Sequence, residues 1–143
     1  MASIVLERKL DSLHRCLERI KTKCPADVEA LAHDADLQDI LVLNLSRAVQ
    51  LCVDMATHTL AETGAPIPET MGSTFDQLAN HHMLDAALAE RLRKAVGFRN
   101  IAVHNYEAIN WAIVYTIATE QLEDFRRFAQ VMLQSGETTD AQG

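Results

Sequence analysis

Apolar side chains recur along most of the chain at spacings of three and four residues, the pattern of amphipathic α-helices. The clearest run is Leu6, Leu10, Leu13, Leu17 and Ile20. No segment alternates apolar and polar residues over a useful length, so we expect no β-sheet. The repeat therefore predicts an all-α fold in which the helices bury their apolar faces against one another in a bundle.

Capping and turn residues divide the periodic segments into four long helices and one short helix. Helices are expected up to Pro25, from near Asp36 to Thr63 before Gly64, from Ser73 as a short helix, from Asp85, and from near Asn110 to about Gln134, ending at Gly136. The predicted architecture is an antiparallel bundle of four main helices plus a short one. It forms one helical domain over residues 1–136, and residues 137–143 are expected to be a disordered tail.

The formal net charge of −7 is distributed unevenly. Residues 25–90 carry eleven acidic side chains and one basic one, Arg47, whereas residues 91–106 carry four basic side chains and no acidic one. The overall charge speaks against a non-specific nucleic-acid binder. Residues 91–106 are the exception, because anionic ligands are not repelled there.

Three cysteines, Cys16, Cys24 and Cys52, form no C-x-x-C pair and are odd in number. This usage predicts reduced thiols and a cytoplasmic protein. The longest stretch without a charged residue is 108–119, shorter than the roughly 20 residues that a membrane span needs. The spacing of His14, Cys16 and Cys24 does not fit a zinc site, so no metal is expected.

Two residues of the basic segment, at positions 97 and 99, are unusual for a buried helix face. The apolar stripe Leu88, Leu92, Ala95 continues at helical spacing to Arg99, which places a charge on a face that should be buried. Gly97 costs about 1 kcal/mol relative to alanine inside a helix and usually marks a close backbone approach. Such violations cluster at functional sites.

The segment Gly97-Phe98-Arg99-Asn100-Ile101-Ala102-Val103-His104-Asn105-Tyr106 resembles the signature of the HEPN superfamily. It is most similar to that of the HepT-type toxins of bacterial, type VII-like toxin–antitoxin pairs. The helical layout fits the same family along most of residues 4–134. The resemblance implies a metal-independent endoribonuclease that needs no cofactor and acts at the interface of a homodimer.

The resemblance makes Arg99 and His104 the catalytic residues, with Asn100 in support. RNA supplies its own nucleophile, the 2′-hydroxyl, so the protein needs only proton transfer and charge stabilisation. An imidazole exchanges protons near neutral pH, and a guanidinium fork matches a phosphate. The resemblance further implies a partner, a minimal nucleotidyltransferase antitoxin that silences the toxin by attaching AMP to Tyr106. The alternative for Tyr106 is a buried tyrosine that closes the apolar stripe.

One chain supplies a single motif histidine, whereas a general base and a general acid are both needed. Residues five apart lie about 140° around a regular helix, so Arg99 and His104 do not face one pocket. Either the helix loosens before His104, or the two groups meet across the chains of a dimer.

Several interpretations stay open at the level of sequence. Arg99 is either catalytic or a structural partner of a carboxylate, for which Asp54 is the candidate. Asp54 either supports the site by steadying Arg99 or belongs to a solvated stripe of its helix. The basic side chains Arg91, Arg93 and Lys94 either lead RNA toward the motif or match the acidic region 25–90. A non-catalytic HEPN module that binds nucleotides or RNA beside a nucleotidyltransferase is the alternative function.

Overall fold

The computed structural model describes residues 4–142, with side chains to residue 135, and this part of the chain is helical without a strand. Its elements are α1 (Ile4–Lys23), α2 (Val28–Ala32), α3 (Ala35–Glu62), α4 (Met71–Asn80), α5 (Ala86–His104), the 3-10 turn η1 (Tyr106–Ala108), α6 (Trp111–Glu120) and α7 (Leu122–Gln142). The all-α prediction is confirmed.

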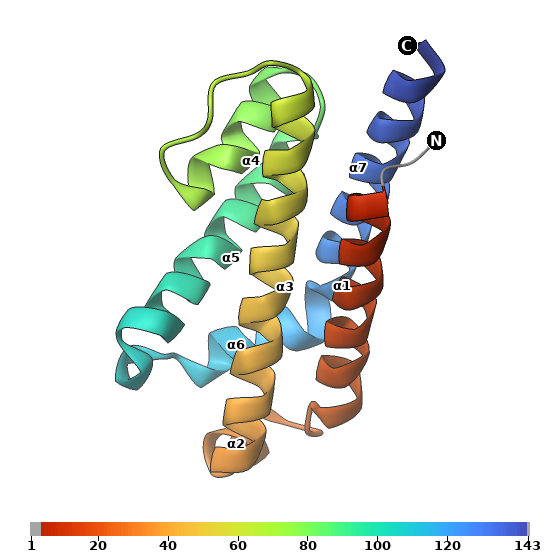
Figure 1. Ribbon diagram of the computed structural model, residues 1–143. Coiled ribbons are helices and arrows are strands. Elements are labelled where there is room, and N and C mark those ends of the chain that lie inside the picture. Colours follow the sequence, from red (N-terminus) through yellow and green to blue (C-terminus); the bar gives the residue numbers. More distant parts are fainter. Residues whose placement is uncertain (1–3, 143) are drawn as a thin grey trace.

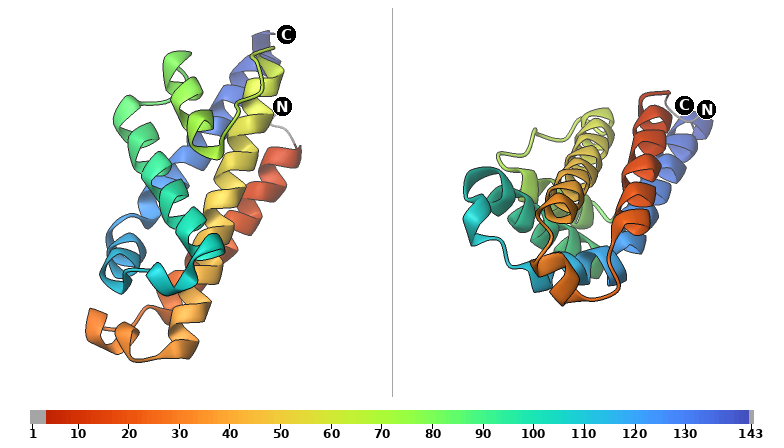
Figure 2. Two further views of the ribbon diagram at one scale, coloured as in Figure 1. Left: turned by 90° about the vertical axis from the view of Figure 1, so that its left-hand side faces the viewer. Right: turned by 90° about the horizontal axis from the view of Figure 1, so that it is seen from below.

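Helix α3 is the centre of the bundle (Figure 1). Helices α1 and α7 pack on one side of it, α4 and α5 on the other, and α2 and α6 close one end (Figures 1 and 2). Leu41, Leu45, Cys52 and Met55 of α3 are fully buried, at the spacing that keeps one helix face inward. This arrangement leaves a second face of α3 uncovered between α1 and α5.

By length and mean hydropathy, α3 is able to cross a membrane. More than half of its most apolar window, 56%, is buried inside the protein, as in the core helix of a bundle. Such a segment is therefore weak evidence for a membrane span.

Several predicted helix boundaries agree with the structure. Helix α1 ends at Lys23, before Pro25, and α3 ends at Glu62, two residues before Gly64, which adopts a φ of 76°. The carboxylate of Asp85 accepts a hydrogen bond of 3.1 Å from the amide of Leu88 and caps α5 as expected.

Other predicted boundaries are wrong. Thr70, not Ser73, caps α4, and the Ser73 hydroxyl accepts from the Thr70 amide to complete a capping box. The last predicted helix is two helices, α6 and α7, which break at Gln121. Helix α7 continues past Gly136 to Gln142. The short helix α2 was not predicted, and the division into a domain and a tail stays a prediction.

Candidate functional site

The motif lies at the end of α5, where the helix projects from the bundle toward η1 (Figure 1). Helical geometry holds through His104, and the amide of Asn105 donates the last helical hydrogen bond to Ile101 at 2.8 Å. The helix breaks after His104 and not between Arg99 and His104, so the first of the two alternatives, a loosening before His104, is wrong. Within one chain the two side chains point about 140° apart.

Arg99 is half-buried at the point where the apolar stripe of α5 leaves the core. Its Nη1 donates to the sulfur of Met71 at 3.6 Å and to Oδ1 of Asn100 at 3.5 Å. Within the described residues no carboxylate pairs with Arg99, so the structural ion pair is excluded there. A thioether and a neutral amide leave the positive charge uncompensated, which suits an anionic ligand.

Asp54 lies elsewhere on α3 and does not steady Arg99. Its carboxylate accepts from Nζ of Lys9 at 3.4 Å and from Nε2 of Gln50 at 2.9 Å. The contact with Lys9 ties α3 to α1, on the opposite side of α3 from α5. Within one chain Asp54 thus has Lys9, and not Arg99, as its cation partner, and its support of the site stays a prediction.

His104 is exposed on the last turn of α5. Among the residues that the structure describes, none forms a hydrogen bond with its ring. Gly97, Ile101 and His104 follow one another at spacings of four and three, so they share one face of α5. This face is the exposed side of the helix.

Tyr106 follows the helix end, in η1, with 40% of its surface exposed. Its hydroxyl donates a hydrogen bond of 2.6 Å to Asp39 on α3, and its ring contacts Trp111 edge-on. Partial burial, the bond to Asp39 and the charge of Asp39 together raise the pKa of Tyr106 to about 12. The alternative of a buried tyrosine on the apolar stripe is therefore wrong.

Sequence reasoning missed Asp39 and Met71, which contact the motif from α3 and α4. Asp39 is separated from Tyr106 by 67 residues, and no local pattern marks it. Only the tertiary fold brings the two side chains within hydrogen-bond distance.

The basic side chains that precede the motif are paired with carboxylates. Arg91 forms two bonds to Asp124, at 3.0 and 3.2 Å. The nearest carboxylate oxygens lie 3.8 Å from Arg93, on Asp76, and 3.9 Å from Lys94, on Glu90. The structure thus pairs all three cations, two of them with acidic residues of the region 25–90, as the charge-matching interpretation predicts.

An apolar groove of about 870 Å³ runs between α5 and α6. Ile101 and Ile113 line it and are 45% and 52% exposed. Gly97 also lines it, and a Cβ atom at Gly97 would meet nothing within 4 Å. The expected close approach at Gly97 is therefore not made inside the chain. Exposed apolar side chains that gather in one place commonly mark an interaction site.

Metal ligands do not gather anywhere in the described residues, where no group of three or more His, Cys, Asp and Glu side chains is placed to hold an ion. The cysteines Cys16, Cys24 and Cys52 are free thiols, as expected.

Comparison with known proteins gives consistent matches. Residues 13–132 match the family described as Ribonuclease HepT-like. The mRNA nuclease HepT of Shewanella oneidensis is 34% identical over 128 residues, which cover 90% of this chain and 96% of the relative.

Two solved structures have the same fold. A toxin–antitoxin structure with AMP-PNP gives a TM-score of 0.85 at 33% identity, covering 91% of this chain and 98% of the other. The tri-AMPylated HEPN toxin of Shewanella oneidensis in complex with its MNT antitoxin gives 0.85 at 34% identity, covering 91% and 97%.

Proposed function

The chain belongs to the HepT-like ribonuclease family, and we propose that it is an endoribonuclease toxin that cleaves RNA with Arg99 and His104. The observation that carries this proposal is the state of the two side chains. Both lie on the last turns of α5, Arg99 without a carboxylate partner and His104 exposed, within the described residues. A structural ion pair would have neutralised Arg99, whereas a phosphate site needs it uncompensated.

The chemistry follows from these groups and from RNA. The 2′-oxygen attacks the adjacent phosphorus, its proton passes to a histidine, and the bond from phosphorus to the 5′-oxygen breaks. The departing 5′-oxygen takes a proton from a second acid. Arg99 binds the phosphate oxygens, whose negative charge grows in the transition state. Asn100 accepts a hydrogen bond from Arg99 and so orients the guanidinium.

A homodimer supplies what one chain lacks. Two copies bring two histidines, one for each proton transfer, and two arginines. Because Arg99 and His104 point apart on a regular helix, they reach a common phosphate only when the two motifs face each other.

We place the contact between the copies at the groove between α5 and α6. Its apolar walls at Ile101 and Ile113 are exposed in the single chain, and burying them stabilises an interface. A side chain at Gly97 would contact nothing inside the chain, so the absence of one leaves room for a second copy of the protein. Since His104 shares this face of α5, docking here brings it to the interface.

Tyr106 is the acceptor of AMP from a nucleotidyltransferase antitoxin in this proposal. Its exposed hydroxyl attacks the α-phosphorus of ATP, pyrophosphate leaves, and Asp39 is the acceptor nearest to the released proton. The relative from Shewanella is a tri-AMPylated toxin bound to its antitoxin, which supports the same control here. The added phosphate lies two residues from His104 and competes with RNA for Arg99.

RNA reaches the motif past Arg91, Arg93 and Lys94, each of which must exchange a carboxylate for a phosphate to take part. We place the protein in the cytoplasm, which keeps its three thiols reduced.

The test compares His104→Ala with His81→Ala, a matched control on the exposed turn after α4. We expect the first variant to lose about 100-fold or more of RNA cleavage, the usual contribution of a general acid or base. The second should cleave like the parent protein. Circular dichroism checks that both fold, and growth after expression reports toxicity. A folded His104→Ala protein that still cleaves RNA and arrests growth would refute the proposal.

A further inference from the structure

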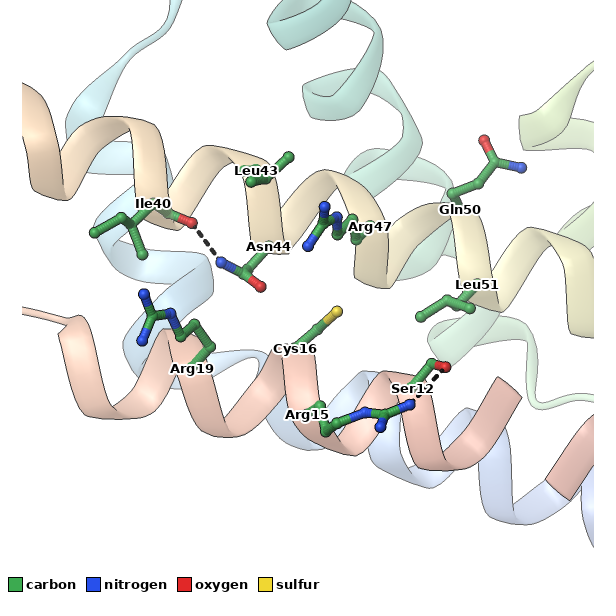
Figure 3. A pocket seen from close by; sticks show the side chains of 10 residues that line it. All are labelled: Ser12, Arg15, Cys16, Arg19, Ile40, Leu43, Asn44, Arg47, Gln50 and Leu51. Atoms are coloured by element: carbon green, nitrogen blue, oxygen red, sulfur yellow. Dashed lines mark hydrogen bonds between the residues drawn. The ribbon is translucent and has the colours of Figure 1, made fainter. Parts of the chain in front are cut away.

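A second groove, of about 690 Å³, lies between α1 and α3 on the uncovered side of the bundle (Figure 3). Arg15 and Arg19 of α1 and Arg47 of α3 line it. Arg19 and Arg47 reach into it from the two opposite helices, while Arg15 extends along α1 toward Ser12 (Figure 3). Among the described residues, no acidic side chain lines the groove.

These three guanidinium groups have no carboxylate partner within residues 4–135. Their one hydrogen bond in this range is from Arg15 to the hydroxyl of Ser12, at 3.4 Å. The positive charges of Arg47 and Arg15 both act on the thiol of Cys16 at the base of the groove, so they bear on the same space. Like charges repel when they are held close, and an anionic ligand removes that cost.

Arg47 contributes a positive charge to the groove from a part of the sequence that is otherwise strongly acidic. It is the single basic residue in the region 25–90, which has eleven acidic ones, yet it lines the same groove as two other arginines. The cations before the motif, in contrast, each have a carboxylate neighbour. Of these two cation clusters, the α1–α3 groove is therefore the one that binds an anion without first releasing a carboxylate.

The remaining lining suits a nucleic-acid strand. Leu43 is 50% exposed beside the arginines and offers an apolar surface to a base or a sugar. Asn44 donates through Nδ2 to the carbonyl of Ile40 at 2.8 Å, which fixes its amide at the groove. Guanidinium groups for phosphate and an apolar surface for a base or a sugar are the combination that single strands require.

The groove and Asp39, the hydrogen-bond partner of Tyr106, both lie on α3. Asp39, which holds Tyr106, is followed by Leu43 and Arg47 at spacings of four, so the three lie on one helix face. Arg47 lies about 12 Å along the helix from Asp39, at 1.5 Å per residue. A strand that leaves the motif along this face reaches the arginines within a short length.

We propose that the α1–α3 groove binds the phosphodiester backbone of the RNA strand beyond the cleavage site, through Arg15, Arg19 and Arg47. This inference rests on the proposed ribonuclease function. It makes the groove a site for extended RNA, so it acts on affinity and leaves the cleavage chemistry untouched.

The test removes the three charges in the full chain, as R15Q/R19Q/R47Q. The matched control is K21Q/K23Q/R127Q, which lowers the net charge equally at cations that are without a carboxylate partner in the described residues and do not line the groove. Fluorescence anisotropy with a labelled single-stranded RNA measures binding, and cleavage is measured on that RNA and on a dinucleotide too short to reach the groove.

We expect the groove variant to bind the long RNA at least tenfold more weakly than the control. The slope of log affinity against log salt concentration should become less steep by about 2, at roughly 0.7 for each lost phosphate contact. KM for the long RNA rises, and cleavage of the dinucleotide stays at the parent rate. R47Q and R19Q alone, both at exposed positions, should each lower the slope by about 0.7.

RNA affinity equal to that of the control overturns the proposal. So does a groove variant that keeps its RNA affinity but no longer binds the purified antitoxin, because the groove would then be a protein interface. Failure of the proposed function is distinguishable: the parent protein would then cleave neither substrate, while the anisotropy comparison still reports on the groove.

Discussion

Replacing Tyr106 by phenylalanine is expected to remove one cause of the protein's loss of stability at alkaline pH. Burial and the 2.6 Å bond to Asp39 raise the pKa of the Tyr106 phenol from 10.0 to about 12. The folded protein therefore holds this proton more tightly than the unfolded chain, whose phenol has its ordinary pKa. The stability that follows is fully present below pH 10 and is lost as the pH rises toward 12.

The magnitude follows from the two pKa values. The difference between 12 and 10 corresponds to about 2.7 kcal/mol, at about 1.36 kcal/mol for each factor of ten in proton affinity. Because 40% of Tyr106 is exposed, solvent screens the interaction with Asp39. We therefore expect about 1 kcal/mol of the free energy of unfolding to disappear over this range.

Urea unfolding, followed by circular dichroism at pH 9 and pH 11.5, measures this loss. The parent protein should lose about 1 kcal/mol more than Tyr106→Phe between the two conditions. Asp39→Asn should fall between them, because its amide oxygen still accepts the hydrogen bond but carries no charge. Other groups titrate equally in all three proteins, so their contributions cancel. Equal losses in the parent and in Tyr106→Phe would refute the coupling of Tyr106 to Asp39.

Two further predictions concern the interface and α3. Ile101→Glu places a charge in the exposed groove between α5 and α6, so the chain should fold but elute with the mass of a monomer by light scattering and cleave RNA at least tenfold more slowly; a dimeric, active variant would place the interface elsewhere. Asp54→Ala removes the contacts to Lys9 and Gln50 and should cost about 1 kcal/mol in urea unfolding without changing RNA cleavage; lost cleavage at unchanged stability would return Asp54 to the site.

The long helices of this protein are predictable from sequence because each carries apolar residues at helical spacing. The stripe of α1 and the turn at Gly64 need only local information, since periodicity and a left-handed glycine are properties of the chain itself. The break at Gln121 is different. Val114 and Ile117 of α6 and Phe125 and Phe128 of α7 are all buried, and tertiary packing turns the chain between them although the apolar pattern continues.

The motif residues of the candidate site could be predicted from sequence, but the side chains that contact them could not. Arg99 stands out in sequence because a charge interrupts an apolar stripe, and His104 and Tyr106 stand out because the segment resembles the HEPN signature. Their neighbours Met71 and Asp39 come from other helices, and no spacing announces them. The cation partner of Asp54 was hidden for the same reason, because the sequence could not show that Lys9 of α1 lies beside it.

Helix α5 stops at His104, and Tyr106 begins the next element. The residue proposed for catalysis and the residue proposed for modification are thus neighbours across a helix end, so control of this enzyme needs no allosteric relay. In the proposed scheme, an AMP group on Tyr106 would block the site of the chain that carries it without a change in the bundle. Toxicity in a cell would then depend on how many unmodified chains form dimers, and not on a graded change in the affinity of each chain for RNA.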